Sequence, residues 1–578
     1  MRAAIDFPAT SAARLQATFD APLARLDAWH PEQVIAALRT AQDWAQAGHW
    51  VVGFVAYEAA PAFDPALACH PPVPGLPLAS FAAYAAAGTW HPPEIATDSA
   101  FRYGPWRAEN GRRQALAQIE TLRAGIRRGD YYQVNLTQRW RAAFEGDPYC
   151  GFLALRETQP EGYGAYLDGG NWQILSVSPE LFFEWTPEGR LLTRPMKGTA
   201  ARGLSPEADH AAAIALAFAA KERAENLMIV DLLRNDVSRV ARTGSVTVPR
   251  LFQVESLPTA WQMTSTVECV TRPDVDLAAV FRALFPCGSV TGAPKHAAMK
   301  AIAARESSPR GAYCGAIGIL EPGGHTRFNV GIRTVSIDRR LARAECGIGS
   351  GITLDSVADD EWAEWLVKRR FLLRASADFS LLETLRLEEG QYWLLDRHLR
   401  RLAGSAAHFG FAYDETGVGC CLDELAAGHG QGTWRIRLLL DRRGNCQTEI
   451  FALEPASVDI TVAWAATPVD GEEEFLRHKT TRREMYACHA PASGVFDTLL
   501  WNAAGEITEF TRGNVVLELD GRQVTPALSS GLLPGVLRAE LLARGEVEEA
   551  VLRREDVAQA TGLWFINSVR GRVPARLR

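Results

Sequence analysis

The pattern of strand and helix signals stops and restarts once along this chain of 578 residues. A helical segment, EWAEWLVKRRFLLRA, ends near Ala375, the short joint ASADFS follows, and a new strand, SLLETLRLEEG, begins at residue 380. On both sides of the joint, short strands bounded by Gly, Pro and Asn mix with helices. We therefore predict two α+β domains, spanning residues 1–375 and 376–578.

Four further expectations concern single elements. A helical pattern over 206–233 predicts one long helix, and a strand pattern over 327–337 predicts one strand. In the second domain we expect a helix over RHLRRLAGSAAHFG (397–410) and another after LLPGV (532–536). Internal repeats and low-complexity runs are absent from the sequence.

The charge balance and the apolar runs exclude several classes of protein. The 68 acidic and 61 basic residues give a net charge of −7 and a pI near 6.0, which provides no electrostatic footprint for nucleic acid. The opening sequence lacks the apolar core of a signal peptide, and AAAIALAFAA (211–220) is too short to span a bilayer. The ten cysteines are scattered without zinc-ligand spacing. We expect a cytoplasmic protein with reduced thiols that binds neither nucleic acid nor membrane.

Lysine is rare, since only six of the 61 basic residues are lysines. Arginine stays protonated, whereas a desolvated lysine can lose its proton and act as a nucleophile or a base. Each lysine is therefore a candidate functional residue, although a surface position is the simpler explanation for most of them. The six are Lys197, Lys221, Lys295, Lys300, Lys368 and Lys479.

Two local patterns suggest chemistry in the first domain. Lys197 lies between Pro-Met and Gly-Thr after a strand, where a fixed backbone and apolar neighbours would favour a nucleophilic amine. Glu361 and Glu364 are three residues apart and Lys368 is four further on, so one helical face can carry all three. Two carboxylates on one face suit Mg²⁺, but the spacing alone favours an exposed Glu364–Lys368 ion pair.

Nine motifs follow one another along the first domain. They are GDYYQVNLTQR (129–139), SPELF (178–182), RPMKGT (194–199), ERAENLMIVDLLRND (222–236), CGSVTGAPK (287–295), GAYCGAIG (311–318), GIRTVSI (331–337), GSGITLDS (349–356) and EWAEWLVK (361–368). In this order they resemble the chorismate-utilising enzymes, which include anthranilate synthase component I, aminodeoxychorismate synthase component I, and the isochorismate and salicylate synthases. The resemblance implies a large α/β sandwich that binds chorismate between its sheets.

The residue at position 197 distinguishes members of that family, because aminodeoxychorismate synthases carry lysine where anthranilate synthases carry alanine. The resemblance implies that Lys197 attacks C2 of chorismate while Glu180 helps the C4 hydroxyl to leave. It also implies that Glu225 and Glu364, with Glu361 alongside, hold Mg²⁺ on the ring carboxylate. The implied substrate-binding residues are Arg333, Tyr313, Ser289, Gly349, Gly351 and Lys368.

The chain departs from the family pattern in ways that change the expectations. Many relatives have a histidine where this chain has Gln262, so we expect no acid–base role at that position. No LLES-type element of the tryptophan-inhibited relatives occurs near the N-terminus, so we do not expect tryptophan feedback. None of the cysteines lies in the Gly-rich elbow of a glutamine amidotransferase. We therefore expect ammonia to come from a separate glutamine amidotransferase subunit.

The second domain carries Arg401 in HLRRL, Lys479 in FLRHKTTRREMY, Glu509 in GEITEFTRGN, and a helix opened by LLPGV. Singly, each charged residue has a simpler explanation as an exposed side chain. Together they resemble the fold-type IV pyridoxal phosphate enzymes, which include branched-chain and D-amino acid aminotransferases and aminodeoxychorismate lyase. The resemblance implies a two-lobed α+β domain in which Lys479 binds pyridoxal 5'-phosphate and Glu509 contacts its ring nitrogen. The implied phosphate-binding residues are Arg401, Gly535, Val536 and Ser568.

Fusion of the two domains predicts synthesis of 4-aminobenzoate, a folate precursor. The first domain would aminate chorismate with ammonia to 4-amino-4-deoxychorismate, and the second would cleave that product to 4-aminobenzoate and pyruvate. Three alternatives remain open at this point. The second domain could be an aminotransferase, the first could be of the anthranilate or isochorismate synthase type, or the first could only dock an amidotransferase.

Overall fold

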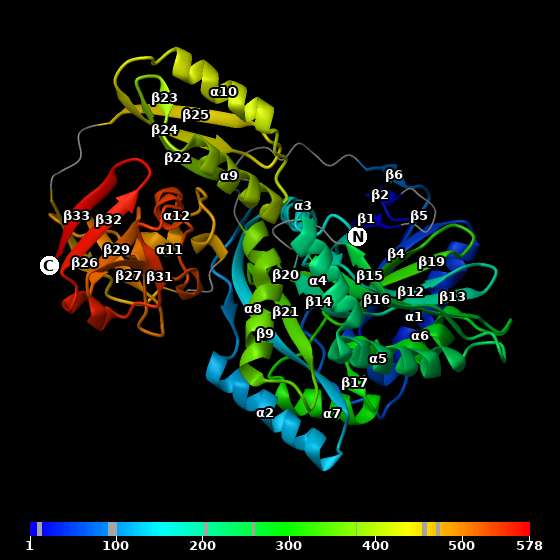
Figure 1. Ribbon diagram of the computed structural model, residues 1–578. Helices are drawn as coiled ribbons and strands as arrows, with labels where there is room; N and C mark the ends of the chain where they lie inside the picture. The colour runs from blue at the N-terminus through cyan, green and yellow to red at the C-terminus, as the bar shows by residue number, and fades with distance from the viewer. Residues whose placement is uncertain are drawn as a thin grey trace. The chain divides into compact units, whose positions relative to one another are not determined.

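The computed structural model describes residues 1–8, 14–90, 101–201, 206–256, 260–376, 379–453, 459–469 and 474–578. The chain divides into two compact units, Met1–Ala377 and Asp378–Arg578 (Figure 1). Each unit combines helices and strands, which confirms the predicted α+β class. Within these described ranges, no helix is both long and apolar enough to cross a membrane.

Two antiparallel sheets form the centre of the first unit, and their inner faces pack together through apolar side chains such as Phe7, Ile174, Phe54 and Ile317. This packing confirms the predicted sandwich. The first sheet contains β17 (Gly292–Ala293), β9 (Gln133–Gly146), β21 (Arg343–Ile352), β20 (Thr334–Asp338), β11 (Trp172–Ser178), β10 (Tyr163–Asp168), β1 (Arg2–Phe7), β2 (Leu15–Phe19) and β6 (Gly88–Thr89) in that order, with β7 (Phe101–Tyr103) and β8 (Arg107–Ala108) beside β9. The second contains β14 (Met196–Ala201), β16 (Ala260–Val270), β13 (Arg190–Arg194), β12 (Leu181–Trp185), β19 (Thr326–Val330), β18 (Ala316–Leu320), β4 (Trp50–Val55), β5 (Ala79–Tyr84) and β3 (Ala24–Ala28), with β15 (Thr247–Ser256) beside β16.

Helices cover the outer faces of the sandwich. One outer core joins the second sheet to α1, α5 and α6, and another joins the first sheet to α2, α3 and α8. In α1, Pro31 starts the helix, and Val34, Leu38 and Ala45 fall on one buried stripe. The helices are α1 (Pro31–Gln46), α2 (Arg112–Arg128), α3 (Pro148–Glu157), α4 (Pro206–Phe218), α5 (Ala220–Ser238), α6 (Leu277–Leu284), α7 (Lys295–Arg305) and α8 (Ala358–Ala375), with short 3-10 turns at Tyr57–Ala62 and Gly288–Val290.

Two predicted elements of the first unit are wrong. The expected helix over 206–233 is divided into α4 and α5, because Ala219 adopts an extended conformation between them. The expected strand over 327–337 is also divided, since β19 belongs to the second sheet and β20 to the first. The chain passes from one sheet to the other through Arg333, which has a φ of +48°. This crossing places Arg333 at the boundary of the two sheets.

The second unit has two lobes, as predicted. Its first lobe is a sheet of β23 (Gln391–Tyr392), β22 (Leu381–Glu388), β24 (Thr433–Leu440) and β25 (Cys446–Ala452), with α9 (Leu395–Phe409) and α10 (Glu415–Ala427). Its second lobe is a sheet of β28 (Ile507–Phe510), β27 (Asp497–Trp501), β26 (Ile460–Trp464), β33 (Gly571–Leu577), β32 (Gly562–Asn567), β29 (Asn514–Leu519), β30 (Arg522–Pro526) and β31 (Glu548–Ala550), with α11 (Glu484–Ala487), α12 (Val536–Ala543) and 3-10 turns at Glu474–Leu476, Leu528–Ser530 and Arg554–Ala558. The expected helices at 397–410 and after LLPGV are α9 and α12.

Candidate functional site

Lys197 lies in a bulge at the edge of the second sheet of the first unit. Strand β14 pairs with β16 through Met196 and Thr264, and pairing resumes at Thr199 and Gln262, so two residues of β14 face one residue of β16. Such a bulge turns a side chain out of the regular pleat. Gly198 has a φ of +94°, a conformation that strains any residue with a side chain. The bulge therefore sets the direction of Lys197.

Glu180 precedes β12 and is buried, with 3% of its surface exposed. Burial raises its pKa to about 7, against the opposing effects of a hydrogen bond from Ser289 and the positive charge of Lys197. Its Oε1 atom has no hydrogen-bond partner among the described residues. Ser289 is also within 3.2 Å of the Cys287 thiol. The structure thus brings together an amine, a carboxyl group that is partly protonated at neutral pH, and a hydroxyl.

The glycine-rich strand β21 lies against Lys197 and Lys368. A Cβ atom on Gly351 would lie 3.2 Å from the Nζ atom of Lys197 and would overlap the amide of Gln133. Lys368 donates a hydrogen bond to the carbonyl oxygen of Gly349 at 3.0 Å. Gln133 was not predicted from the sequence, yet it is buried and its Oε1 atom lacks a partner within the described residues. Two predicted glycines and two lysines therefore meet here.

Four glutamates on two helices lie near these lysines. Glu222 and Glu225 are on α5, and Glu361 and Glu364 are on α8. Burial raises the pKa of Glu222 and of Glu225, and the negative charge of Glu361 raises each further. Glu222 was missed by the sequence analysis, although its spacing from Glu225 repeats the spacing of Glu361 and Glu364. Mutual repulsion of this kind is typical of carboxylates that share one site.

Glu361 and Glu364 also contact side chains close to them in the sequence. Glu361 accepts hydrogen bonds from Ser350 and, at 2.7 Å, from Ser356. Glu364 forms an ion pair of 2.6 Å with Lys368, and although burial alone would raise the pKa of Glu364, this ammonium group keeps it below its usual value. In the described ranges no three acidic, His or Cys side chains approach closely enough to hold a metal ion. The donor chemistry of the four carboxylates nevertheless fits Mg²⁺.

Arg333 and Tyr313 contact residues other than Lys197 and Glu180. The Arg333 guanidinium stacks 5.8 Å from the Phe371 ring, and burial together with Arg374 lowers its pKa to about 10. Tyr313 accepts a hydrogen bond from Thr137 at 3.4 Å. No described hydrogen bond joins either residue to Lys197.

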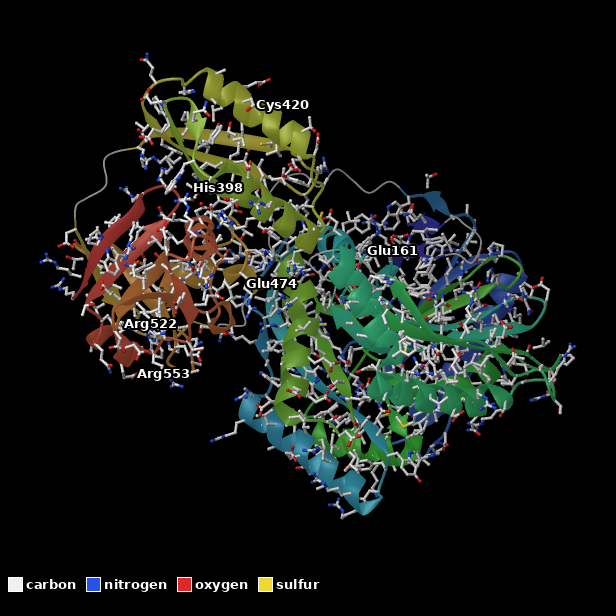
Figure 2. The ribbon with its side chains drawn as sticks, in the orientation of Figure 1. Glu161, His398, Cys420, Glu474, Arg522 and Arg553 are labelled. Atoms are coloured by element: carbon white, nitrogen blue, oxygen red, sulfur yellow. The ribbon has the colours of Figure 1, made fainter. Side chains whose placement is uncertain are left out.

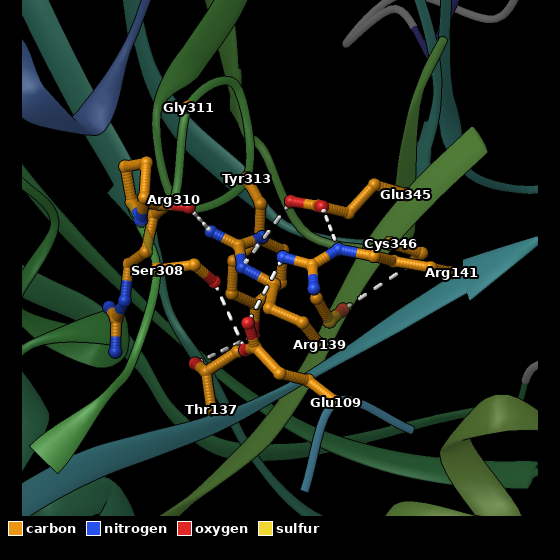
Figure 3. Close-up of polar contacts among 12 residues, drawn as sticks. Glu109, Thr137, Arg139, Arg141, Ser308, Arg310, Gly311, Tyr313, Glu345 and Cys346 are labelled. Atoms are coloured by element: carbon orange, nitrogen blue, oxygen red, sulfur yellow. Dashed lines mark hydrogen bonds and ion pairs between the residues drawn. The ribbon is translucent and has the colours of Figure 1, made fainter. Parts of the chain in front are cut away.

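Tyr313 is held by a partly buried network of charges that the sequence did not predict (Figure 3). The Arg139 guanidinium lies 5.3 Å from the centre of the Tyr313 ring. Glu345 faces Arg139 at 3.7 Å and pairs with Arg141 at 2.6 Å. Arg141 also pairs with Glu109 at 3.1 Å. This network fixes β9 against β21, the two strands that carry Gln133 and the site glycines.

In the second unit, Lys479 lies where the two lobes meet. Its carbonyl oxygen accepts a hydrogen bond from the amide of Leu382 on β22, at 2.9 Å. Burial lowers the pKa of Lys479 to about 8, and Arg401 and Arg483 lower it too, against the charges of nearby glutamates. The amine is therefore partly unprotonated near neutral pH.

Glu509 lies in β28 and is buried, with 3% of its surface exposed. Its Oε1 atom accepts a hydrogen bond from the Tyr486 hydroxyl at 2.8 Å, and its Oε2 atom accepts one from Asn514 at 3.4 Å. Burial raises the pKa of Glu509 to about 8, while Tyr486 and Arg483 oppose this effect. Tyr486 was not among the predicted site residues.

Arg401 extends from α9 toward the loop that precedes α12. It donates two hydrogen bonds to Glu383, at 2.8 and 2.6 Å, and one to the carbonyl oxygen of Pro534 at 3.3 Å. His398, on the same helix (Figure 2), also contacts Glu383 at 2.6 Å. Although burial alone would raise the pKa of Glu383, Arg401 and His398 hold it at about 2. The predicted cation is thus oriented by a carboxylate.

The predicted phosphate cup surrounds the start of α12. Gly535 caps this helix, Val536 is its first residue, and a Cβ on Gly535 would overlap the side-chain oxygen of Asn514. Asn514 also donates to the Leu533 carbonyl at 2.9 Å, so it links the cup to Glu509. Ser568 is buried at the end of β32. The free amides of α12 and the Arg401 guanidinium fit a bound phosphate group.

Comparison with known proteins covers both units. Residues 3–374 match the family described as chorismate binding enzyme, and residues 380–577 match the family described as amino-transferase class IV. The aminodeoxychorismate synthase of Streptomyces griseus is 41% identical over 271 residues, or 47% of this chain and 37% of that protein. Aminodeoxychorismate synthase component 1 of Salmonella typhimurium is 40% identical over 259 residues, or 45% of this chain and 56% of that protein. The chain therefore spans only part of the length of these relatives.

The structural comparison agrees for the first unit. Anthranilate synthase component I from Streptococcus pneumoniae matches with a TM-score of 0.52 at 26% identity, over 64% of this chain and 89% of that one. The class IV match indicates pyridoxal phosphate as the cofactor of the second unit. The chain belongs to the chorismate-binding enzyme family, and a class IV aminotransferase domain follows its chorismate-binding domain.

Proposed function

We propose that this chain makes 4-aminobenzoate from chorismate and ammonia in two steps, the first in residues 1–375 and the second in residues 376–578. The observation that carries the proposal is the pairing of Lys197 with the partly protonated Glu180 in one site. The relatives that match the first unit at 40% and 41% identity are named aminodeoxychorismate synthases, which supports the same reaction.

In the first step, Lys197 acts as the nucleophile and Glu180 as the acid. The Nζ atom forms a bond to C2 of chorismate while the C4–O bond breaks, and Glu180 gives its proton to the departing hydroxyl, which leaves as water. Ammonia then forms a bond to C4 and the C2–Nζ bond breaks, so that the amine of Lys197 is released. The net change replaces the C4 hydroxyl by an amino group.

The same site must hold a dianionic substrate. We assign the ring carboxylate to Mg²⁺ held by Glu225 and Glu364, with Glu361 and Glu222 alongside. When bound, this ion would neutralise the carboxylate and orient the ring. The remaining recognition is assigned to Arg333, Tyr313, Ser289, Lys368 and the backbone at Gly349 and Gly351.

In the second step, pyridoxal phosphate supplies an electron-withdrawing ring that stabilises negative charge on the substrate carbon. Lys479 removes the proton from C4 of aminodeoxychorismate, and the C3–O bond breaks as the ring becomes aromatic. Lys479 then returns a proton to the methylene carbon of the departing enolpyruvate, which leaves as pyruvate. Glu509 would hold a proton on the ring nitrogen of the bound cofactor. Its phosphate would be held by Arg401, Gly535, Val536 and Ser568.

We infer that ammonia reaches the first unit from a separate glutamine amidotransferase subunit. The purified chain should therefore use ammonium but not free glutamine.

A product assay tests the whole proposal. Purified chain is incubated with chorismate, ammonium, Mg²⁺ and pyridoxal phosphate, and products are identified by mass spectrometry. We expect 4-aminobenzoate and pyruvate without any added lyase. Anthranilate or isochorismate as the main product would assign the first unit to another reaction, and accumulation of aminodeoxychorismate would contradict the lyase assignment.

A further inference from the structure

The bulge that carries Lys197 leaves two backbone carbonyl groups outside the regular ladder between β14 and β16. Both are capped by amide side chains. The carbonyl oxygen of Gly198 accepts a hydrogen bond from Nε2 of Gln262 at 2.8 Å. The carbonyl oxygen of Lys197 accepts one from Nδ2 of Asn226 at 3.4 Å.

Each amide is oriented through its oxygen atom. Oε1 of Gln262 accepts a hydrogen bond from the Thr199 hydroxyl at 3.0 Å. Oδ1 of Asn226 accepts one from the Ser265 hydroxyl at 2.6 Å, and Ser265 in turn accepts one from the amide of Phe252 at 3.0 Å. Because a carboxamide has one acceptor end and one donor end, a donor on the oxygen directs the NH₂ group toward the carbonyl.

We propose that Asn226 and Gln262 are positioning residues that clamp the β-bulge through its two carbonyl groups and thereby fix the direction of Lys197. The clamp draws on separate elements, since Asn226 is on α5 and Gln262 is on β16. Asn226 is fully buried and adjoins Glu225, so one turn of α5 positions both the bulge and a proposed metal ligand. The effect of the clamp on the rate of synthesis rests on the role proposed above for Lys197, whereas its effect on the position of Lys197 does not.

The clamp also gives Gln262 a function that differs from that of a histidine. A carboxamide does not titrate, so its hydrogen bonds to Gly198 and Thr199 persist across the pH range in which an imidazole gains a proton. Small displacements of a reacting group are costly, and an error of about 1 Å can lower a rate by about 10²-fold.

The test uses two nearly isosteric variants, Gln262→Glu and Asn226→Asp. Each replaces the NH₂ donor by an oxygen that repels the bulge carbonyl. We expect kcat for aminodeoxychorismate synthesis to fall by about 10²-fold, with a much smaller change in KM for chorismate. Gln262→Ala removes the donor without adding charge, and it replaces Gln262→Glu in the test if the charged variant does not fold. The matched control is Gln253→Glu, an exposed position on the neighbouring strand β15.

A second readout reports on the clamp without catalysis. Brief acetylation with acetic anhydride, followed by peptide mass spectrometry, gives the labelling rate of Lys197 relative to the exposed Lys300 on α7. We expect this ratio to rise in the clamp variants and to stay constant in Gln253→Glu. Cleavage of supplied aminodeoxychorismate and the melting temperature show that the variants are folded.

The possible outcomes separate the two proposals. The clamp would be overturned if the labelling of Lys197 is unchanged and the rate of synthesis stays within about twofold of the parent. That margin is near the usual effect of a surface substitution. Full synthesis by Lys197→Ala would overturn the proposed function of Lys197, and the labelling ratio would still decide whether the clamp exists.

Discussion

Tyr486 donates its phenol hydrogen to Oε1 of Glu509 at 2.8 Å, beside the loop that carries Lys479. This hydrogen bond favours the ionised carboxylate, whereas burial of Glu509 favours the neutral acid. The balance matters because the ionised carboxylate stabilises a protonated pyridine nitrogen by its charge, whereas the neutral acid does not. Tyr486 therefore links the lysine motif to the residue that is proposed to control the cofactor ring.

Tyr486→Phe should weaken the binding of pyridoxal phosphate. A hydrogen bond to a charged group contributes ~1.5–3 kcal/mol, and because this bond exists before the cofactor binds, only part of that energy affects Kd, so we expect a rise of up to about tenfold. Fluorescence titration of the apoprotein with the cofactor measures this change. Tyr392→Phe is the control, because it removes a phenol hydrogen bond to the Leu422 carbonyl in the same unit. An unchanged Kd for Tyr486→Phe would contradict the proposed link.

Lys197→Ala should abolish aminodeoxychorismate synthesis, because alanine offers no nucleophile for C2. Cleavage of supplied aminodeoxychorismate should continue at the parental rate, since the second unit is unchanged. Coupled product analysis measures both activities, and Lys300→Ala is the control for loss of an exposed lysine. Traces of anthranilate are expected, because anthranilate synthases carry alanine at this position.

Lys479 should be the attachment point of pyridoxal phosphate. The other five lysines precede residue 369, and the burial of Lys479, which lowers its pKa to about 8, favours the free amine. Borohydride reduction of the holoprotein followed by peptide mapping locates the adduct. A reduced adduct on another lysine would overturn this assignment, and Lys479→Ala should yield no stable adduct.

The pH–rate profile of the first step should bend downward near about pH 7. Glu180 must be protonated to act as an acid, and burial raises its pKa to about 7. The protonated fraction of Glu180 therefore decreases above that pH. Lys197 must be unprotonated to act as a nucleophile, so deprotonation of its amine acts in the opposite direction, and the slope of the profile is lower above that pH than below it. Glu180→Gln should lower the rate and remove that bend. A profile of Glu180→Gln that keeps the same bend would assign it to a different group.

Glu383→Gln should destabilise the second unit. The folded pKa of Glu383 is about 2, below its usual 4.5, because Arg401 and His398 outweigh the effect of burial. Its contribution to stability is therefore complete above pH 4.5 and is lost as the pH falls toward 2. Breaking a buried ion pair costs ~3–5 kcal/mol, since Arg401 keeps an uncompensated charge. Calorimetry measures the shift in melting temperature, with Glu388→Gln as the control for the more exposed pair with Arg386.

The apolar patterns of the sequence predicted the two α+β units, whereas the sandwich and the two lobes were implied by the family resemblances of the ordered motifs. The sequence did not predict the division of 206–233, since neither Gly nor Pro marks the break at Ala219, which adopts an extended conformation. The division of 327–337 was also hidden, because the change of sheet at Arg333 depends on distant strands.

The candidate sites show the same limit. Glu180 and Lys197 are 17 positions apart and Ser289 follows Lys197 by 92, and the proximity of the three was available only through the family resemblance. Glu222 repeats the spacing of a recognised pair and was therefore detectable, but Gln133 and Tyr486 became candidates only from burial and contacts. A residue that acts by orienting another carries no spacing signal of its own.

The position of α8 at the end of the first unit has a consequence for biosynthesis. This helix carries Glu361, Glu364 and Lys368, and its buried Trp365 belongs to the outer core of the first sheet. The sheets also pair the first strands of the chain with strands far along it, a topology of high contact order that folds slowly. During translation, the first site is therefore incomplete until about residue 375 has left the ribosome, and the nascent chain carries an uncovered apolar face that chaperones recognise.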